Sequence, residues 1–279
     1  MDANHRLVVI FAHPDDESFG FGGVLSAFAE AGFETTYVVA TRGELGEILV
    51  PELATRDTLG EVRERELRAA LRLLGVADLR MLGFRDSGMD GSPENQDPRA
   101  FMNQDVDVVA ETVAGIIVEK QPTIVITYGL DGIYGHPDHI MAHKVGHAAV
   151  LKAADLGWKT PNLYYSSASR ERVKQMASYP NSAFAKMAPE VLETFGTPAA
   201  EITTWMDTSA YWERKLSALR AHRTQVGDNG PFGHLSDDDR QMWLSVEMAR
   251  TVPLPWNPDP RDVLAELLPM AAADHPFRA

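Results

Sequence analysis

A short polar segment, His13-Pro14-Asp15-Asp16-Glu17, directly follows the apolar run that ends at Ala12. If this segment forms a turn, His13 and Asp16 are three residues apart and can face one point, with Asp15 close by. Catalytic zinc takes three protein ligands and leaves one position to water, so these residues offer two ligands and a spare carboxylate as a base. The acids could instead cap the following helix, but capping does not need a histidine.

A second segment repeats the arrangement. His136-Pro137-Asp138-His139 follows the apolar run "TIVITYG" and a loop that contains three glycines. Either His136 or His139 would complete a three-ligand zinc site with the first segment, and the spacing alone leaves that choice open. His143, four residues beyond His139, gives another chelating spacing, although packing of a helix face explains it better.

The strands and helices around the two segments determine whether they can meet. Arg6 to Ala12 is β-branched without polar alternation, which is typical of a strand buried on both faces of a parallel sheet. We expect further strands near 33–43, 78–88, 123–129 and 162–169. We expect the intervening helices at 19–31, 57–74, 102–120 and 137–154. This alternation predicts a Rossmann-like, three-layer α/β fold with a mainly parallel sheet. Ligands bind outside the carboxyl ends of such strands, so both segments would face one crevice.

The regular alternation of predicted strands and helices becomes less clear from about Pro180 onward. We therefore expect a catalytic α/β domain over residues 1–179. Residues 180–279 would form a C-terminal helical extension that packs on the same domain and covers the substrate side. Within it we expect helices at Tyr211–His222 and Ser236–Arg250, the second with Ser236 as its N-cap and aspartates in its first turn.

The composition limits the classes of function. The 279 residues include no cysteine, so any metal must be held by histidine, aspartate or glutamate. A formal net charge of −14 argues against a nucleic-acid partner. No apolar run approaches the roughly 20 residues that cross a bilayer, and the N-terminus lacks a signal-peptide layout, so we expect a cytoplasmic protein with no membrane partner. The sequence leaves a homo-oligomer open.

Several motifs together resemble one family, the LmbE-like or PIG-L-type zinc N-deacetylases of N-acetylglucosaminides. The matching pieces cover roughly the first 170 residues. They are "AHPDDE" at 12–17, "RGELGE" at 42–47, "VRERELRAALRLLGV" at 62–76, "LGFRDSGM" at 82–89 and "YGHPDH" at 134–139. The first and last of these, each after a strand, form a specific combination. In the C-terminal third, "LRAHRTQV" resembles a stretch of the family members that act in sugar-thiol pathways.

The resemblance implies a role for each matching residue. It assigns one zinc ion per chain, with iron(II) or cobalt(II) as substitutes, to His13, Asp16 and His139. Asp15 would be the general base, and His136, oriented by Asp138, would act as an acid or stabilise the oxyanion. Tyr134 would reach the tetrahedral intermediate. The positions that match the sugar pocket of the family are Glu44, Arg63 and Asp86.

The function that this resemblance implies is hydrolysis of the N-acetyl group of an N-acetylglucosaminyl glycoside. The substrate would be a small amino sugar with an inositol-like or malate-like aglycone, as in sugar-thiol biosynthesis. A zinc amidase that cleaves a sugar-thiol conjugate, or a chitooligosaccharide deacetylase, is the alternative within this class. A carbohydrate-binding protein with an inert metal site is a different class, disfavoured by the complete set of ligands and bases. A nucleotide-binding Rossmann protein is disfavoured because no G-x-G-x-x-G follows the first strand.

Overall fold

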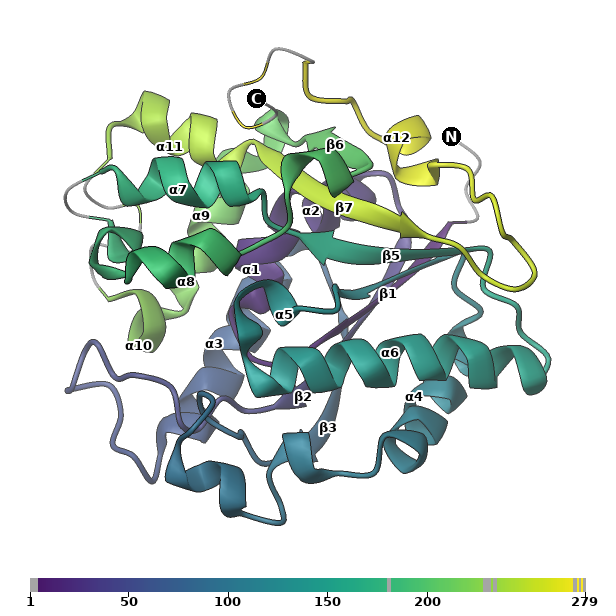
Figure 1. Cartoon of the computed structure of the whole chain (residues 1–279), viewed down its shortest axis with the longest axis horizontal. Coiled ribbons are helices and arrows are strands. Elements are labelled where there is room, and N and C mark those ends of the chain that lie inside the picture. Colours follow the sequence, from purple (N-terminus) through teal and green to yellow (C-terminus); the bar gives the residue numbers. More distant parts are fainter. Residues whose placement is uncertain are drawn as a thin grey trace.

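A seven-stranded sheet forms the centre of the computed structural model, which describes residues 5–179, 182–227, 232, 235–272, 275 and 277 (Figure 1). The strands lie in the order β3-β2-β1-β4-β5-β7-β6. Their bounds are β1 (Arg6–Phe11), β2 (Glu34–Thr41), β3 (Asp78–Phe84), β4 (Ile124–Tyr128), β5 (Asn162–Ser167), β6 (Thr204–Asp207) and β7 (Val246–Val252).

The first five strands are parallel, as the sequence predicts. In β1, Val8 lies opposite Thr36 of β2 on one side and Val125 of β4 on the other. Leu7 to Phe11 are almost completely buried, because helices cover both faces of the sheet. The strand order reverses between β1 and β4, and such a switch point opens a crevice at the carboxyl ends of the two strands.

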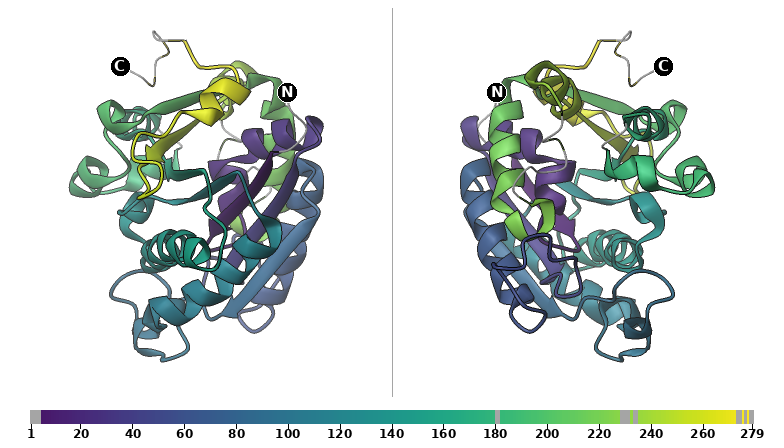
Figure 2. Two further views of the ribbon diagram at one scale, coloured as in Figure 1. Left: turned by 90° about the vertical axis from the view of Figure 1, so that its right-hand side faces the viewer. Right: turned by 90° about the vertical axis from the view of Figure 1, so that its left-hand side faces the viewer.

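The helices form the two outer layers of the fold (Figure 2). Helices α2, α3 and α9 pack together on one face of the sheet, and α4 and α6 pack together on the other. The α-helices are α1 (Asp16–Gly20), α2 (Gly22–Glu30), α3 (Leu59–Leu74), α4 (Val106–Lys120), α5 (Gly132–Gly135), α6 (Pro137–Asp155), α7 (Arg170–Ala177), α8 (Pro189–Thr194), α9 (Trp212–Ala221), α10 (Arg223–Val226), α11 (Asp237–Leu244) and α12 (Val263–Leu267). The 3-10 helices are η1 (Pro93–Gln96), η2 (Phe101–Asn103), η3 (Ala183–Lys186), η4 (Ala199–Glu201) and η5 (Ser209–Tyr211).

Two of the expected helices differ from the structure. The helix expected at 19–31 is two helices, α1 and α2, separated at Phe21. The helix expected at Ser236–Arg250 is wrong in its second half. Ser236 does cap α11 by accepting from the Asp239 amide, but the chain then enters β7. Residues 246–252 are mostly buried and pair antiparallel with β5, and this pairing overrides the local helix propensity.

The C-terminal third is therefore not only helical. Its strands β6 and β7 extend the same sheet that carries β1 and β4, so this segment shares the architecture of the first 179 residues. The helices of the C-terminal third pack around a second apolar cluster centred on Trp243. This cluster includes Trp205, Leu244, Met248 and Phe277. The boundary at 179/180 stays a prediction. Among the described helices, none is long and apolar enough to cross a membrane.

Candidate active site

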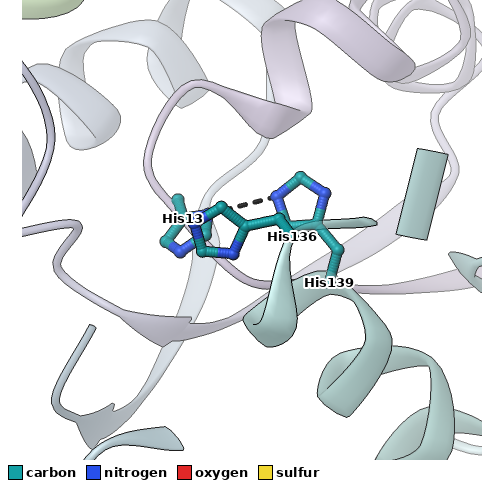
Figure 3. Close-up of side chains that lie close together, drawn as sticks. All are labelled: His13, His136 and His139. Carbon is teal, nitrogen blue, oxygen red and sulfur yellow. Dashed lines mark hydrogen bonds between the residues drawn. The ribbon is translucent and has the colours of Figure 1, made fainter. Parts of the chain in front are cut away.

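The two polar segments of the sequence meet at the switch point of the sheet. His13 follows β1, and His136 and His139 follow β4, the neighbouring strand. His136 is the N-cap of α6, and Pro137 occupies its first helical position, where a missing N–H costs nothing. The three imidazoles lie together at the start of α6 (Figure 3).

Two of these imidazoles, those of His13 and His139, also lie close to the Asp16 carboxylate. His13 Nδ1 lies 3.2 Å from His139 Nε2 and 3.7 Å from an Asp16 carboxylate oxygen. His139 Nε2 is 3.5 Å from the other Asp16 oxygen. Ligand atoms of a tetrahedral zinc ion are separated by about 3.3 Å, given zinc–nitrogen bonds of roughly 2.0–2.1 Å. The donor set and its spacing therefore fit a divalent cation.

Two groups of described side chains bring one ligand atom each within 4.8 Å of one another: His13, His136 and His139, and His13, Asp86 and Asp138. Asp16 is in neither group, because it approaches the two imidazoles with different oxygens. The hydrogen bonds identify His13 Nδ1 and His139 Nε2 as the candidate ligand atoms, which fits either Asp16 or His136 as the third ligand. His13 Nε2 donates to Asp138 at 3.1 Å, and His139 Nδ1 donates to the Gly132 carbonyl at 3.1 Å. The imidazoles of His13 and His139 thus each donate a hydrogen bond from the nitrogen that would not bind the metal, which is the usual arrangement for a ligating histidine.

The electrostatics of the cluster favour positive charge. Burial by itself would lower the pKa of the His13 imidazole, but its hydrogen bond to Asp138 and the nearby Asp86 and Asp16 raise that pKa to about 9. The carboxylates around His13 therefore attract a cation at this point, whether a proton or a metal ion.

Asp138 has a different partner from the one we expected. Its carboxylate accepts from His13 Nε2, from the Ser87 amide at 2.9 Å, and from the Ser87 hydroxyl. His136 instead accepts at Nδ1 from the Asp138 backbone amide, 3.1 Å away, because it caps the helix. We expected Asp138 to orient His136. It does so through its backbone amide, while its carboxylate contacts His13. Ser87 is a residue that sequence reasoning missed, although it follows β3 at the same edge.

This cap determines the state of His136. Since Nδ1 accepts a hydrogen bond, a neutral ring carries its proton on Nε2. Burial and the neighbouring His13 and His139 lower the pKa of His136 to about 3. Burial and the two neighbouring imidazoles therefore favour a neutral His136 that donates from Nε2, and its role in the reaction stays a prediction.

Asp15 lies beside the cluster with its carboxylate against Arg63. Arg63 Nη2 is 3.1 Å from an Asp15 oxygen. Burial raises the pKa of Asp15 to about 6, and Arg63 opposes that shift. The guanidinium also donates to the carbonyls of Pro14 and Gly43. A Cβ at Gly43 would lie 2.0 Å from Arg63 Nη1, so glycine is required for this approach.

The three residues expected in the sugar pocket mainly form hydrogen bonds with backbone groups of neighbouring loops in the structure. Arg63 is 3% exposed and is occupied by the contacts above. The Asp86 carboxylate accepts from the Leu45 and Gly88 amides, and Glu44 accepts from the Asp86 amide. Their role in substrate binding stays a prediction.

Tyr134 projects from a strained turn. The preceding residue, Ile133, has a φ of 71°, which is unusual for a β-branched residue. The Tyr134 ring packs edge-on against His139, with centroids 5.0 Å apart, and stacks on Phe195 at 5.5 Å. Phe195 comes from the C-terminal third, and no motif in the sequence indicates this contact.

A cavity of about 410 Å³ opens beside the cluster. Asp15, Asp16, Tyr134 and His139 lie at one end of it. Most of its apolar wall comes from residues beyond β5: Val173, Met176, Phe184, Met187, Phe195, Phe232, Trp243, Leu244, Val246 and Met248. Residues after β5 therefore form much of the cavity wall next to the cluster, and the expectation that 180–279 cover a substrate stays a prediction.

The sequence of this site matches a described family. Residues 8–150 match the PIG-L family, described as GlcNAc-PI de-N-acetylase. The chain belongs to the PIG-L family. PIG-L deacetylases are metal-dependent hydrolases, in agreement with the His and Asp cluster.

Relatives named 1D-myo-inositol 2-acetamido-2-deoxy-alpha-D-glucopyranoside deacetylase extend the similarity of this PIG-L chain beyond residue 150. The protein from Geodermatophilus obscurus is 39% identical over 274 residues, covering 90% of this chain and 93% of the relative. That from Thermobifida fusca is 41% identical over 262 residues, covering 88% and 91%.

Solved structures share the fold at low identity. The N,N'-diacetylchitobiose deacetylase of Pyrococcus horikoshii aligns with a TM-score of 0.60 at 20% identity, over 89% of this chain and 84% of that one. GalB, a 4-carboxy-2-hydroxymuconate hydratase of Pseudomonas putida KT2440, aligns with a TM-score of 0.58 at 17% identity, over 89% and 96%. A deacetylase and a hydratase thus share this PIG-L fold, so the reaction must be argued from the site.

Proposed function

We propose that this chain hydrolyses the N-acetyl amide of 1D-myo-inositol 2-acetamido-2-deoxy-α-D-glucopyranoside, releasing acetate and the free amine. The observation that carries the reaction is the convergence of His13, Asp16 and His139, with Asp15 beside them. The inositol aglycone is supported by relatives that align over almost the whole chain, including the part that walls the cavity.

We assign the metal to His13 Nδ1, Asp16 and His139 Nε2, and we propose zinc as the ion. Iron(II) and cobalt(II) suit the same donors. A divalent ion at this point would lower the pKa of a water molecule and polarise the amide carbonyl.

The residues of the chain itself supply the proton transfers and the hydrogen bonds. Asp15 accepts the proton of the attacking water and can pass it to the leaving amine, so that water and amide become acetate and amine. His136 Nε2–H and the Tyr134 hydroxyl donate to the carbonyl oxygen as it gains charge. Ser87 and Asp138 fix the ring of His13.

We expect Asp138→Asn to weaken zinc binding by about 10- to 100-fold, the usual cost of losing a group that orients a metal ligand. The amide can accept from only some of the three donors that the carboxylate now satisfies. Titration of the metal-free protein with zinc against a competing chelator measures this affinity. An unchanged affinity would remove Asp138 from the metal site.

We expect His136→Asn to lower kcat by about 10²–10³-fold with zinc retained, because one donor to the oxyanion is lost. Asparagine is a good N-cap, so it keeps the start of α6 while removing Nε2–H. Steady-state kinetics and metal analysis of the same preparation measure the two quantities. Wild-type turnover in this variant would exclude His136 from the reaction.

The substrate is tested by incubating the zinc-loaded protein with three compounds and following acetate and amine by mass spectrometry. The compounds are the N-acetylglucosaminyl glycosides of inositol and of malate, and N,N'-diacetylchitobiose. We expect the inositol glycoside to give the highest kcat/KM. A preference for either other compound would reassign the aglycone, and absence of acetate from all three would refute the deacetylase.

A further inference from the structure

Asp15 has a backbone conformation that a non-glycine residue rarely adopts. Its φ is 104° and its ψ is −26°, in the left-handed region. Such a conformation persists only where surrounding contacts hold it, and it is often found at reacting residues. The contacts that hold Asp15 therefore bear on the function of its carboxylate.

The backbone of Asp15 is held by a buried carboxylate. Glu17 accepts from the Asp15 amide at 3.0 Å with one oxygen. Its other oxygen accepts from His222 Nε2 at 2.6 Å and from the Ser18 hydroxyl at 2.5 Å. Glu17 and His222 are both fully buried. An ionised carboxylate only accepts, so His222 must carry its proton on Nε2 toward Glu17.

His222 belongs to a segment from the C-terminal third that docks on the catalytic half. It lies between α9 and α10, and these helices contact α1 and α3 (Figure 1). Two residues later, Thr224 donates from its amide and its hydroxyl to Glu66 of α3, at 2.9 and 2.6 Å. One turn earlier on α3 is Arg63, which holds the Asp15 carboxylate. The segment thus holds the backbone of Asp15 through Glu17, and it is anchored on α3, the helix that also carries Arg63.

We propose that His222, acting through Glu17, is a positioning residue that fixes the Asp15 carboxylate for proton transfer. This inference rests on the proposed function, in which Asp15 is the base. Neither His222 nor Glu17 is among the residues that line the cavity, so their action on the reaction passes through Asp15. The stretch "LRAHRTQV" then has a physical role: it carries the brace for the first motif of the chain.

The first test is His222→Ala in the zinc-loaded protein. We expect kcat to fall about 10- to 100-fold. Without the hydrogen bond from His222, Glu17 no longer fixes the Asp15 backbone, and proton transfer requires the carboxylate to be placed within a fraction of an ångström. KM and zinc content should stay within about twofold, since substrate and metal contacts are untouched. His222→Gln, which returns an N–H donor to Glu17, should recover most of the rate.

The control is Asp262→Ala, which removes a polar network between β5, β6 and α12 that does not include Asp15 or Glu17. Asp262 accepts from the hydroxyls of Tyr164 and Thr204 and caps α12. This variant should lower the melting temperature as His222→Ala does, but leave kcat unchanged. Equal losses of kcat in both variants would mean that His222 acts only through stability.

Two further measurements decide between positioning and other roles. In an Asp15→Asn background, His222→Ala should cost less than about a further twofold in kcat, because both changes affect one group. If the double variant instead lost kcat by the product of the two single losses, the proposal would be overturned. A crystal structure of His222→Ala should show Asp15 out of the left-handed region, and an unchanged Asp15 would also overturn it. The crystal structure decides the point even if no substrate is deacetylated, an outcome that would refute the proposed function separately.

Discussion

Replacement of Asp15 by asparagine should leave zinc bound and lower kcat by about 10²–10⁴-fold, the typical contribution of a general base. The carboxylate lies beside the proposed metal ligands and inside the cavity, where it can reach an attacking water. Burial already raises its pKa to about 6, against the opposing effect of Arg63. A base with a pKa nearer neutrality is a better match for proton transfer at physiological pH.

The pH profile gives this prediction a second, independent readout. The base works only when ionised, so the wild-type rate should fall as the pH drops through the pKa of Asp15, and Asp15→Asn should lack that acidic limb. Kinetics at several pH values, with metal analysis of each preparation, test both points. Asp57→Asn, at an exposed acid before α3, is the matched control. Wild-type turnover in metal-replete Asp15→Asn would contradict the assignment.

Replacement of His139 by alanine should weaken zinc binding by more than about 100-fold, since losing a group that merely orients a ligand already costs 10- to 100-fold. His139 Nε2 lies within 3.5 Å of both the His13 and the Asp16 ligand atoms. Deacetylation should be lost in parallel, and excess zinc should restore only part of it.

His143→Ala is the control for this experiment. His143 lies one turn further along α6 and donates from Nδ1 to the Tyr128 carbonyl at 2.9 Å, outside the cluster. Its removal should leave the zinc content of the purified protein unchanged. If His139→Ala kept full zinc occupancy, our assignment of His139 would be wrong, and the alternative set of His13, His136 and His139 would be excluded with it.

The parallel core of the fold could be predicted from local pattern. Strands β1 and β4 are uninterrupted apolar runs, and the helices between strands have an apolar stripe at the helical period, as in α3. The end of the chain could not be predicted in this way. The stretch at 246–252 lacks a clear period, and only its partner β5, some 80 residues earlier in the sequence, makes it a strand.

The sequence by itself determined that two segments rich in histidine and aspartate lie at the ends of buried strands. The first His-Pro-Asp segment stands directly after a buried strand, and the second follows another buried strand by a short loop. The strand order at a switch point brings such ends together. This follows from local geometry, since each segment lies next to the strand that positions it.

Only the tertiary structure decided how those residues are held and in which state. In the structure, the Asp138 carboxylate accepts from His13 and Ser87, His136 caps α6, and His222 donates to Glu17, which holds the Asp15 amide. The physical reason is that hydrogen-bond partners and burial depend on groups that are distant in sequence. Glu17 and His222 are 205 residues apart, and no periodicity or spacing encodes such a contact.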